Sequence, residues 1–97
     1  MLVECFPLYI NSATPQIPLI RIIERRGLLP YFKAVLGRPR KKVENLQYVQ
    51  DREQLEPTKI LFVGDGQGDL DAAMAFGCAF VGVWHETSHF LQRPEDA

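Results

Sequence analysis

Short apolar runs alternate with amphipathic segments along most of the chain, a pattern typical of strands that alternate with helices. Strands are predicted at residues 8–10, 31–36, 60–63 and 79–83. The run 60–63 contains no polar residue, so it predicts a strand buried on both faces of a sheet. This order of elements predicts an α/β fold with a parallel sheet and right-handed crossovers.

The first helix is predicted from its apolar stripe and from the residues at its ends. Thr14 and Pro15 suit the cap and the first helical position, and Gly27 suits the end. Pro18 has no N–H group to donate, so the regular helix is expected to begin at Pro15 or nearer Pro18.

Two further helices are predicted later in the chain. One covers residues 41–55 and ends before Pro57, and the other follows Asp69 and ends at Gly77. The apolar residues of the first of these helices are expected to face a core, and they are Val43, Leu46, Val49 and Leu55.

Composition fits a globular protein, with 97 residues, 46% of them hydrophobic and 24% charged. We expect one partial core domain over residues 1–97 with a tail at 84–97. The net charge of -1 predicts no nucleic-acid or membrane partner, and no apolar run is long enough to span a bilayer. The start of the chain does not look like a signal peptide, and Cys5 and Cys78 are expected to be free thiols. A cytoplasmic location is therefore expected.

A glycine-rich turn with two carboxylates follows the third predicted strand. Asp65 leaves the carboxyl end of this strand, and Asp69 opens the next helix. Ligands bind at the carboxyl ends of strands in open α/β sheets, and Mg²⁺ prefers oxygen ligands. Asp65 and Asp69 are therefore a candidate Mg²⁺ site. The alternative is an ordinary strand-to-helix turn in which Asp69 caps the helix.

Two more polar positions suit a phosphate group. Ser12 ends the first predicted strand, and its hydroxyl could hold a phosphate oxygen together with neighbouring backbone N–H groups such as that of Ala13. Lys42 follows a basic turn and could offset phosphoryl charge. The alternatives are a serine that only starts a turn and a solvated lysine at the start of a helix.

Taken in order, these motifs resemble those of the haloacid dehalogenase-like hydrolase superfamily, most closely its phosphatases. Leu8-Tyr-Ile-Asn-Ser12-Ala-Thr-Pro15 resembles the second motif of that family, and Gly37-Arg-Pro-Arg-Lys-Lys42-Val-Glu-Asn resembles the third. Phe62-Val-Gly-Asp65-Gly-Gln-Gly-Asp69-Leu-Asp-Ala-Ala73 is similar to the fourth. The resemblance covers residues 8–83 and implies a three-layer core with a parallel sheet.

The resemblance also implies an activity and a role for each residue. The activity is Mg²⁺-dependent hydrolysis of a phosphorylated small molecule through an aspartyl-phosphate. Ser12 would contact phosphoryl oxygens, Lys42 would steady the nucleophile and the phosphate, and Asp65 and Asp69 would hold Mg²⁺.

The first motif of the family, an Asp-x-Asp that supplies the nucleophile, has no counterpart here. Asp69-Leu-Asp71 has the spacing but belongs to the fourth motif. We therefore expect an incomplete core, without the nucleophile strand and the cap, that is inactive alone. It would be the carboxyl-terminal part of a longer hydrolase or a truncated product. Such a core would self-associate or take a strand from another polypeptide.

Two other function classes remain open at this stage. His85-Glu86-Thr-Ser-His89 matches the His-Glu-x-x-His pattern of zinc proteases, with Glu95 or Asp96 as the remaining candidate ligand. The alternative at this position is a solvated loop or short helix. The chain could also be a non-catalytic interaction module that uses open sheet edges or the basic residues 38–42, which are otherwise a solvated turn.

Overall fold

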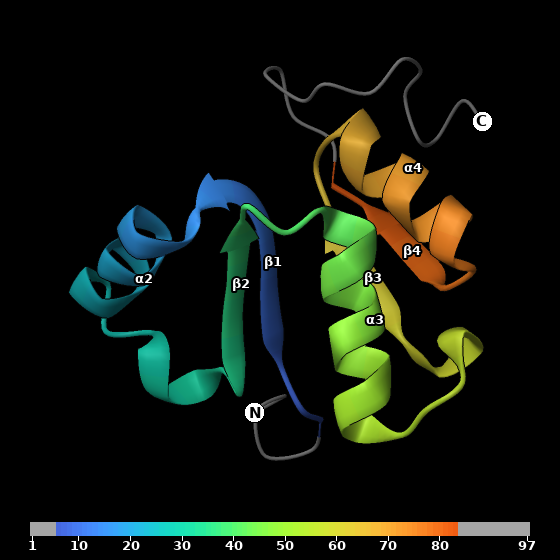
Figure 1. Cartoon of the computed structure of the whole chain (residues 1–97), viewed down its shortest axis with the longest axis horizontal. Coiled ribbons are helices and arrows are strands. Elements are labelled where there is room, and N and C mark those ends of the chain that lie inside the picture. The colour runs from blue at the N-terminus through green and yellow to red at the C-terminus, as the bar shows by residue number, and fades with distance from the viewer. Residues whose placement is uncertain (1–5, 84–97) are drawn as a thin grey trace. The chain divides into compact units, whose positions relative to one another are not determined.

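The computed structural model of the chain describes residues 6–83, in which strands and helices alternate as the sequence predicts (Figure 1). The chain divides between Val49 and Gln50 into two compact units. The elements in order are β1 (Tyr9–Pro15), α2 (Gln16–Arg25), the 3-10 turn η1 (Leu29–Tyr31), β2 (Ala34–Arg38), α3 (Lys42–Glu53), the 3-10 turn η2 (Pro57–Lys59), β3 (Leu61–Gly64), α4 (Gln67–Phe76) and β4 (Ala79–Gly82).

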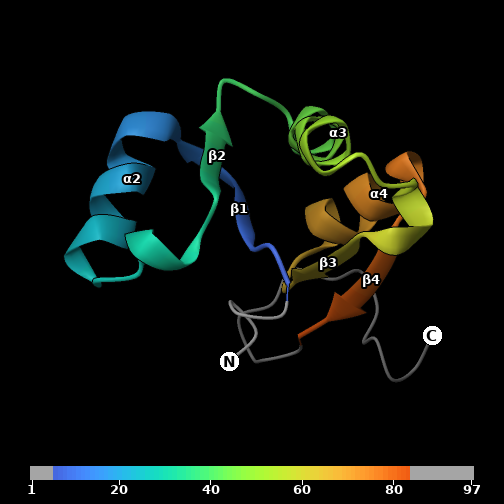
Figure 2. The ribbon, with the colours of Figure 1, turned by 90° about the horizontal axis from the view of Figure 1, so that it is seen from below.

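In the first unit, β1 and β2 pair in parallel and pack against α2 (Figure 2). Ile10 lies opposite Val35 in the register, and both belong to a core that includes Leu19 and Ile23 of α2. The apolar stripe of α2 is therefore buried against one face of this sheet, as its sequence pattern predicts.

The other face of the β1–β2 sheet contacts α3. Side chains alternate between the two faces of a strand, so Tyr9 and Asn11 point away from α2. The ring of Tyr9 meets that of Tyr48 edge-on, with centroids 6.4 Å apart. The amide of Asn45 donates a hydrogen bond to that of Asn11. Both faces of this sheet are therefore covered within the first unit.

The predicted start of the first helix is wrong at both alternatives. Thr14 and Pro15 belong to β1, and α2 begins at Gln16, with Pro15 as a cap that makes no side-chain hydrogen bond. Pro18 is the third residue of α2, where a backbone N–H would have no partner inside the helix, so the ring is tolerated there. The end of the helix is as predicted, because Gly27 adopts a left-handed conformation with φ of 68°.

In the second unit, β3 and β4 pair in parallel and α4 packs on one face (Figure 2). Phe62 lies opposite Phe80 in the register, and their rings meet edge-on with centroids 6.0 Å apart. The prediction that residues 60–63 are buried on both faces is wrong, because Leu61 is 58% exposed and Val63 is 55% exposed. They alternate with Phe62 and so lie on the face that α4 does not cover.

Two other boundaries differ from the sequence-based prediction. Residues 29–31 form η1, so the second strand starts at Ala34 and continues through Gly37. Of the apolar residues predicted to face a core from the second helix, Leu46 is buried as predicted and Val49 is half-buried. Val43 is exposed, and Leu55 is exposed and lies beyond the end of α3 at Glu53. Asn45 is buried beside Leu46 because it bonds to the sheet. Among residues 6–83, no helix has the length and apolar character needed to cross a membrane.

Candidate phosphate and magnesium site

The segment after Asn11 leaves the regular ladder between β1 and β2. The register runs in step as far as Asn11 and Leu36, is interrupted, and resumes with Pro15 opposite Arg38. Within the interruption, the backbone N–H of Thr14 donates to Oγ of Ser12 over 3.1 Å. A hydroxyl that accepts one hydrogen bond keeps its own hydrogen for donation. Irregularities of this kind often redirect side chains next to binding sites.

The side chain of Gln16 bonds to two main-chain groups of β2. Its Nε2 donates to the carbonyl oxygen of Val35 over 2.7 Å, and its Oε1 accepts from the N–H of Gly37 over 2.6 Å. Gly37 has no room for a side chain, because a Cβ there would collide with the backbone oxygen of Thr14. The side chain of Gln16 therefore pairs two polar main-chain groups of β2 next to the irregular segment.

Lys42 is the first residue of α3 and is half-buried. Its carbonyl oxygen accepts a hydrogen bond from Nδ2 of Asn11 over 3.0 Å. The preceding N–H, that of Lys41, donates to Oε1 of Glu44 over 2.8 Å, as in the second half of a capping box. The start of this helix is thus fixed both by its own residues and by β1.

Asn45 completes this arrangement from inside the sheet–helix interface. It is 0% exposed, and its Nδ2 donates to Oδ1 of Asn11 over 2.9 Å and to the carbonyl oxygen of Leu36 over 3.3 Å. We call the side chains of Asn11 and Asn45, with the carbonyl groups of Leu36 and Lys42, the amide network. Through it, the residue next to Ser12 is connected to Lys42.

Sequence reasoning assigned no role to either residue of the amide network. Asn11 lies in the motif that contains Ser12, and Asn45, which ends the motif that contains Lys42, lies among the polar residues of a helix. An asparagine with such neighbours is usually exposed. Nothing in the sequence pattern distinguishes it from a solvated residue.

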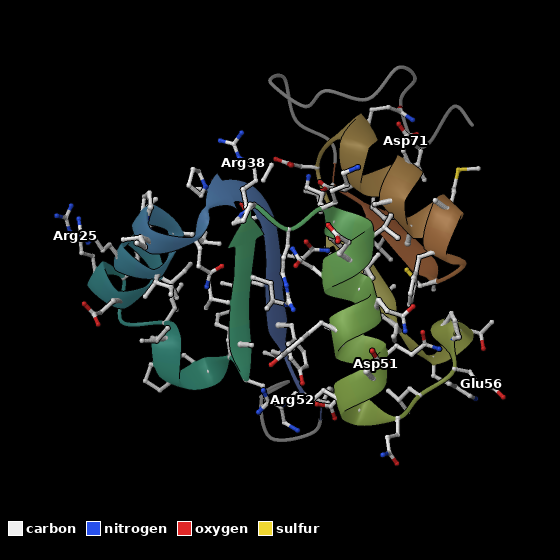
Figure 3. All side chains as sticks on the ribbon, in the orientation of Figure 1. Arg25, Arg38, Asp51, Arg52, Glu56 and Asp71 are labelled. Atoms are coloured by element: carbon white, nitrogen blue, oxygen red, sulfur yellow. The ribbon has the colours of Figure 1, made fainter. Side chains whose placement is uncertain are left out.

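The basic turn before α3 is exposed, as expected of a solvated turn. Arg38, Arg40 and Lys41 are all exposed, and Arg38 extends outward from the end of β2 (Figure 3). The guanidinium carbon of Arg40 lies 4.9 Å from the centre of the Tyr48 ring, within the range of a cation–π contact. This contact anchors Arg40 to the side of α3.

The second unit carries the two predicted metal ligands on one strand-to-helix turn. Asp65 directly follows β3 and is exposed, whereas Asp69 lies in the first turn of α4 and is 8% exposed. The alternative role of Asp69 as helix cap is wrong, because Gly66 occupies the cap position. The first residue of the helix is Gln67, and Asp69 is its third.

The carboxyl group of Asp69 folds back over the turn. A Cβ built on Gly64 would lie 2.5 Å from Oδ2 and 2.6 Å from Cγ of Asp69, so only glycine leaves space for this carboxyl group. A buried carboxylate oxygen of Asp69 therefore lies beside Gly64, the residue that precedes Asp65. Mg²⁺ is commonly held by one or two carboxylates together with water or phosphate oxygens, so the donor set fits this ion.

Asp71 has a different environment from Asp69. It is exposed, and its Oδ1 accepts a hydrogen bond from Nε2 of Gln67 over 2.8 Å on the outside of α4 (Figure 3). This agrees with the sequence-based interpretation that Asp69-Leu-Asp71 is part of a helix.

The site residues are thus divided between the two units. Ser12, Ala13 and Lys42 belong to the first, and Asp65 and Asp69 belong to the second. Within residues 6–83, no group of three or more His, Cys, Asp or Glu side chains could hold a metal ion. The candidate zinc pattern at His85 and His89 lies outside the described residues.

Curated relatives of the chain are phosphoglycolate phosphatases. The chain is 34% identical over 73 residues to the enzyme of Vibrio vulnificus strain YJ016, covering 70% of this chain and 32% of the relative. It is 33% identical over 79 residues to that of Escherichia coli K12, covering 75% of this chain and 30% of the relative. The chain therefore spans about a third of the length of these relatives.

Solved structures of similar fold come from the same group of proteins. A predicted phosphoglycolate phosphatase from Haemophilus somnus 129PT matches with a TM-score of 0.80 and 28% identity, covering 96% of this chain and 43% of that one. The core domain of a candidate phosphoglycolate phosphatase from Streptococcus pneumoniae TIGR4 matches in fold with a TM-score of 0.59 and 23% identity, covering 91% and 68%. No model of a protein family matches the chain. By sequence and by fold together, the chain belongs to the haloacid dehalogenase-like hydrolases, of whose core domain it forms a part.

Proposed function

We propose that this chain provides the phosphate-binding and magnesium-binding parts of a phosphomonoester hydrolase that acts through an aspartyl-phosphate. In this proposal Ser12 and the backbone N–H of Ala13 bind phosphoryl oxygens, and Lys42 offsets their charge. Asp65 and Asp69 hold Mg²⁺, which when bound would neutralise charge on the phosphoryl group.

The observation that carries the proposal is the carboxyl group of Asp69, buried against Gly64 on the turn that also presents Asp65. The turn has space only for glycine beneath this carboxylate, so the oxygens of Asp69 lie beside the residue that precedes Asp65. Carboxylate oxygens are among the ligands that Mg²⁺ prefers. The connection of Lys42 to β1 supports the phosphate half of the proposal.

The proposed substrate is a phosphorylated small molecule with a carboxylate, of which phosphoglycolate is the example. The support for this choice is that the relatives from Vibrio and Escherichia are named phosphoglycolate phosphatases. The exposed basic residues Arg38, Arg40 and Lys41, which precede Lys42, are suited to a second anionic group.

We further propose that the nucleophile comes from outside these 97 residues. None of the aspartates in the sequence combines the end of an apolar strand with the Asp-x-Asp spacing of the family's first motif. Loss of a nucleophile lowers the rate of well-studied covalent hydrolases by about 10⁶. The 97-residue polypeptide should therefore release no phosphate from phosphoglycolate above a buffer blank, and measurable turnover would contradict this part of the proposal.

The magnesium site is tested by titrating the 97-residue chain with Mg²⁺ in a calorimeter. We expect saturable binding that Asp69→Asn weakens at least about tenfold, because one charged ligand is lost, and that Asp65→Asn also weakens. Asp71→Asn is the matched control, since Asp71 is exposed and bonded to Gln67. Equal effects at all three positions would mean that Mg²⁺ only screens charge, and the site would be rejected.

The proposal extends to self-association or pairing with a strand from another polypeptide. It is supported by the described sheets, each of which has two strands, because sheets of this size are marginally stable and have open edges. Analytical ultracentrifugation of the 97-residue chain should then show a concentration-dependent dimer. A monomer across the concentration range that also unfolds cooperatively would contradict this expectation.

A further inference from the structure

The start of α3 is connected to the sheet by two side-chain amides, those of Asn11 and Asn45, to which the resemblance to the haloacid dehalogenase-like motifs assigns no role. Asn45 is fully buried, and its Nδ2 bonds both to Oδ1 of Asn11 and to the carbonyl oxygen of Leu36. Asn11 in turn donates to the carbonyl oxygen of Lys42. The chain of hydrogen bonds therefore runs from β2 through α3 to β1 and back to the first residue of α3.

Each bond of the amide network has a defined direction, and asparagine satisfies it at both positions. Asn11 accepts from Asn45 and donates to the carbonyl oxygen of Lys42 at the same time, and a side-chain amide offers both an acceptor and donors. Asn45 uses both hydrogens of its amide group. A carboxylate at position 45 would have no hydrogens to donate to Oδ1 of Asn11 and the carbonyl oxygen of Leu36. An alanine would also leave these two oxygens without their donor.

The network is also expensive to bury, which indicates a purpose beyond packing. Oδ1 of Asn45 has no hydrogen-bond partner among the described residues, although the side chain is 0% exposed. An unpaired buried polar atom costs about 1–3 kcal/mol. A leucine or alanine at position 45 would not bring this unpaired atom, but it would remove the donor to the oxygens of Asn11 and Leu36 and would not connect Lys42 to the strand that carries Ser12.

We propose that Asn45, acting through Asn11, is the positioning residue for Lys42. The two amides fix the backbone of Lys42 relative to β1, so the Lys42 side chain is attached at a fixed position near the Ser12 segment. The Lys42 residue then loses less conformational entropy when a phosphate binds. This inference rests on the proposed role of Lys42 as a phosphate ligand.

The test is a double-mutant cycle that compares the affinity of variants of the 97-residue chain for inorganic phosphate. The affinity is measured by NMR titration in the absence of Mg²⁺, so that Asp65 and Asp69 are not involved. We expect Lys42→Ala to weaken phosphate binding at least about tenfold and Asn45→Ala to weaken it about fivefold. In the Lys42→Ala background, Asn45→Ala should change the affinity less than about twofold, because its effect depends on Lys42. Gln47→Ala, an exposed amide on α3, is the control and should leave the affinity unchanged.

The outcomes separate this inference from the proposed function. If the unmodified chain does not bind phosphate, or if Lys42→Ala binds it normally, the proposed role of Lys42 fails and the inference fails with it. If Lys42→Ala weakens binding but Asn45→Ala does not, only the positioning inference is overturned. Additive effects of Asn45→Ala and Lys42→Ala would show a general structural role, which also overturns it.

Two further measurements keep the test decisive if Asn45→Ala does not fold. Asn11→Ala removes the same bond to the carbonyl of Lys42 at a half-buried position, and it should give the same pattern in the cycle. Hydrogen exchange of the backbone amides at the start of α3 should accelerate in Asn11→Ala but not in Gln47→Ala. Unchanged exchange in Asn11→Ala would show that the network does not hold this turn.

Discussion

The carboxyl group of Asp69 occupies the space that a side chain on Gly64 would need. An ideal Cβ on Gly64 would lie 2.5 Å from both Cβ and Oδ2 of Asp69, closer than real Cβ atoms approach other atoms. The glycine that ends β3 and the aspartate in the first turn of α4 therefore depend on each other. The spacing of Gly64 and Asp69 in the glycine-rich motif therefore brings these two residues into direct contact.

The first prediction is that Gly64→Ala disrupts the metal site while Gly66→Ala does not. A methyl group on Gly64 must displace the Asp69 carboxyl group, so we expect Mg²⁺ affinity to fall at least about tenfold. Overpacking should also destabilise the chain by about 1–3 kcal/mol. Calorimetric titration with Mg²⁺ and urea denaturation measure the two effects.

Gly66→Ala is a matched control two residues away. A Cβ on Gly66 would meet only Oδ2 of Asp69, at an ordinary contact distance of 3.8 Å, and its φ of -140° suits any residue. Equal loss of Mg²⁺ affinity in both variants would show that the turn tolerates no side chain at all, and the specific contact with Asp69 would lose its support.

The second prediction concerns the side chain of Gln16, which bonds to the main chain of β2. Gln16→Ala would leave the carbonyl of Val35 and the N–H of Gly37 unpaired, and we expect a loss of about 1–3 kcal/mol in the free energy of unfolding. Ile17→Ala, one residue further along α2 at an exposed position, should change this free energy by no more than about 0.5 kcal/mol. Urea denaturation of both variants would decide, and similar values would show that the Gln16 bonds contribute little.

The arrangement around Gln16 shows how far sequence reasoning can reach in this chain. The alternation of elements, the parallel pairing and the left-handed Gly27 and Gly77 follow from hydrophobic periodicity and glycine chemistry, and all are confirmed. The start of α2 was misplaced because Thr14 and Pro15 have strong local preferences for a helix start. The helix instead begins at Gln16, whose side chain bonds to β2, a contact between residues far apart in sequence.

In the candidate site too, features set by neighbouring residues could be predicted from the sequence, whereas features set by contacts between distant residues could not. The glycine-rich spacing around Asp65 and Asp69 predicts that both lie on one turn, because the turn is local. The amide network could not be predicted, because an asparagine in a polar helix has no sequence signature of burial. The exposure of Leu61 and Val63 was missed for a similar reason, since an apolar run does not reveal how many of its faces are covered.

The third prediction is that the hydroxyl of Ser12 contributes to phosphate binding. Its Oγ already accepts a hydrogen bond from the N–H of Thr14, so the hydroxyl hydrogen is directed elsewhere. Ser12→Ala removes this donor and should weaken binding of inorganic phosphate about fivefold, whereas Ser12→Thr keeps the hydroxyl and should bind within about twofold of the unmodified chain. NMR titration compares the three proteins. Equal affinities in all of them would leave Ser12 with only its role in the turn.

The fourth prediction concerns Cys78, a free cysteine just after α4. Burial disfavours the thiolate and raises the pKa of Cys78 above its ordinary value of 9.0, while a backbone hydrogen bond opposes this in part. Less thiolate is then present at any given pH, so Cys78 in a Cys5→Ser variant should react with a thiol reagent at pH 8 more slowly than it does after unfolding in urea.

The same shift in pKa sets the sign of a stability change with pH. The folded state holds the Cys78 proton more tightly than the unfolded state, so this thiol stabilises the fold below the ordinary pKa of 9.0, and its contribution is lost as pH rises through the raised pKa. In Cys78→Ala, the fall in the free energy of unfolding above pH 9 should therefore be shallower than in the parent Cys5→Ser protein. Identical pH profiles for the two proteins would show that Cys78 ionises as easily in the folded chain as in the unfolded one.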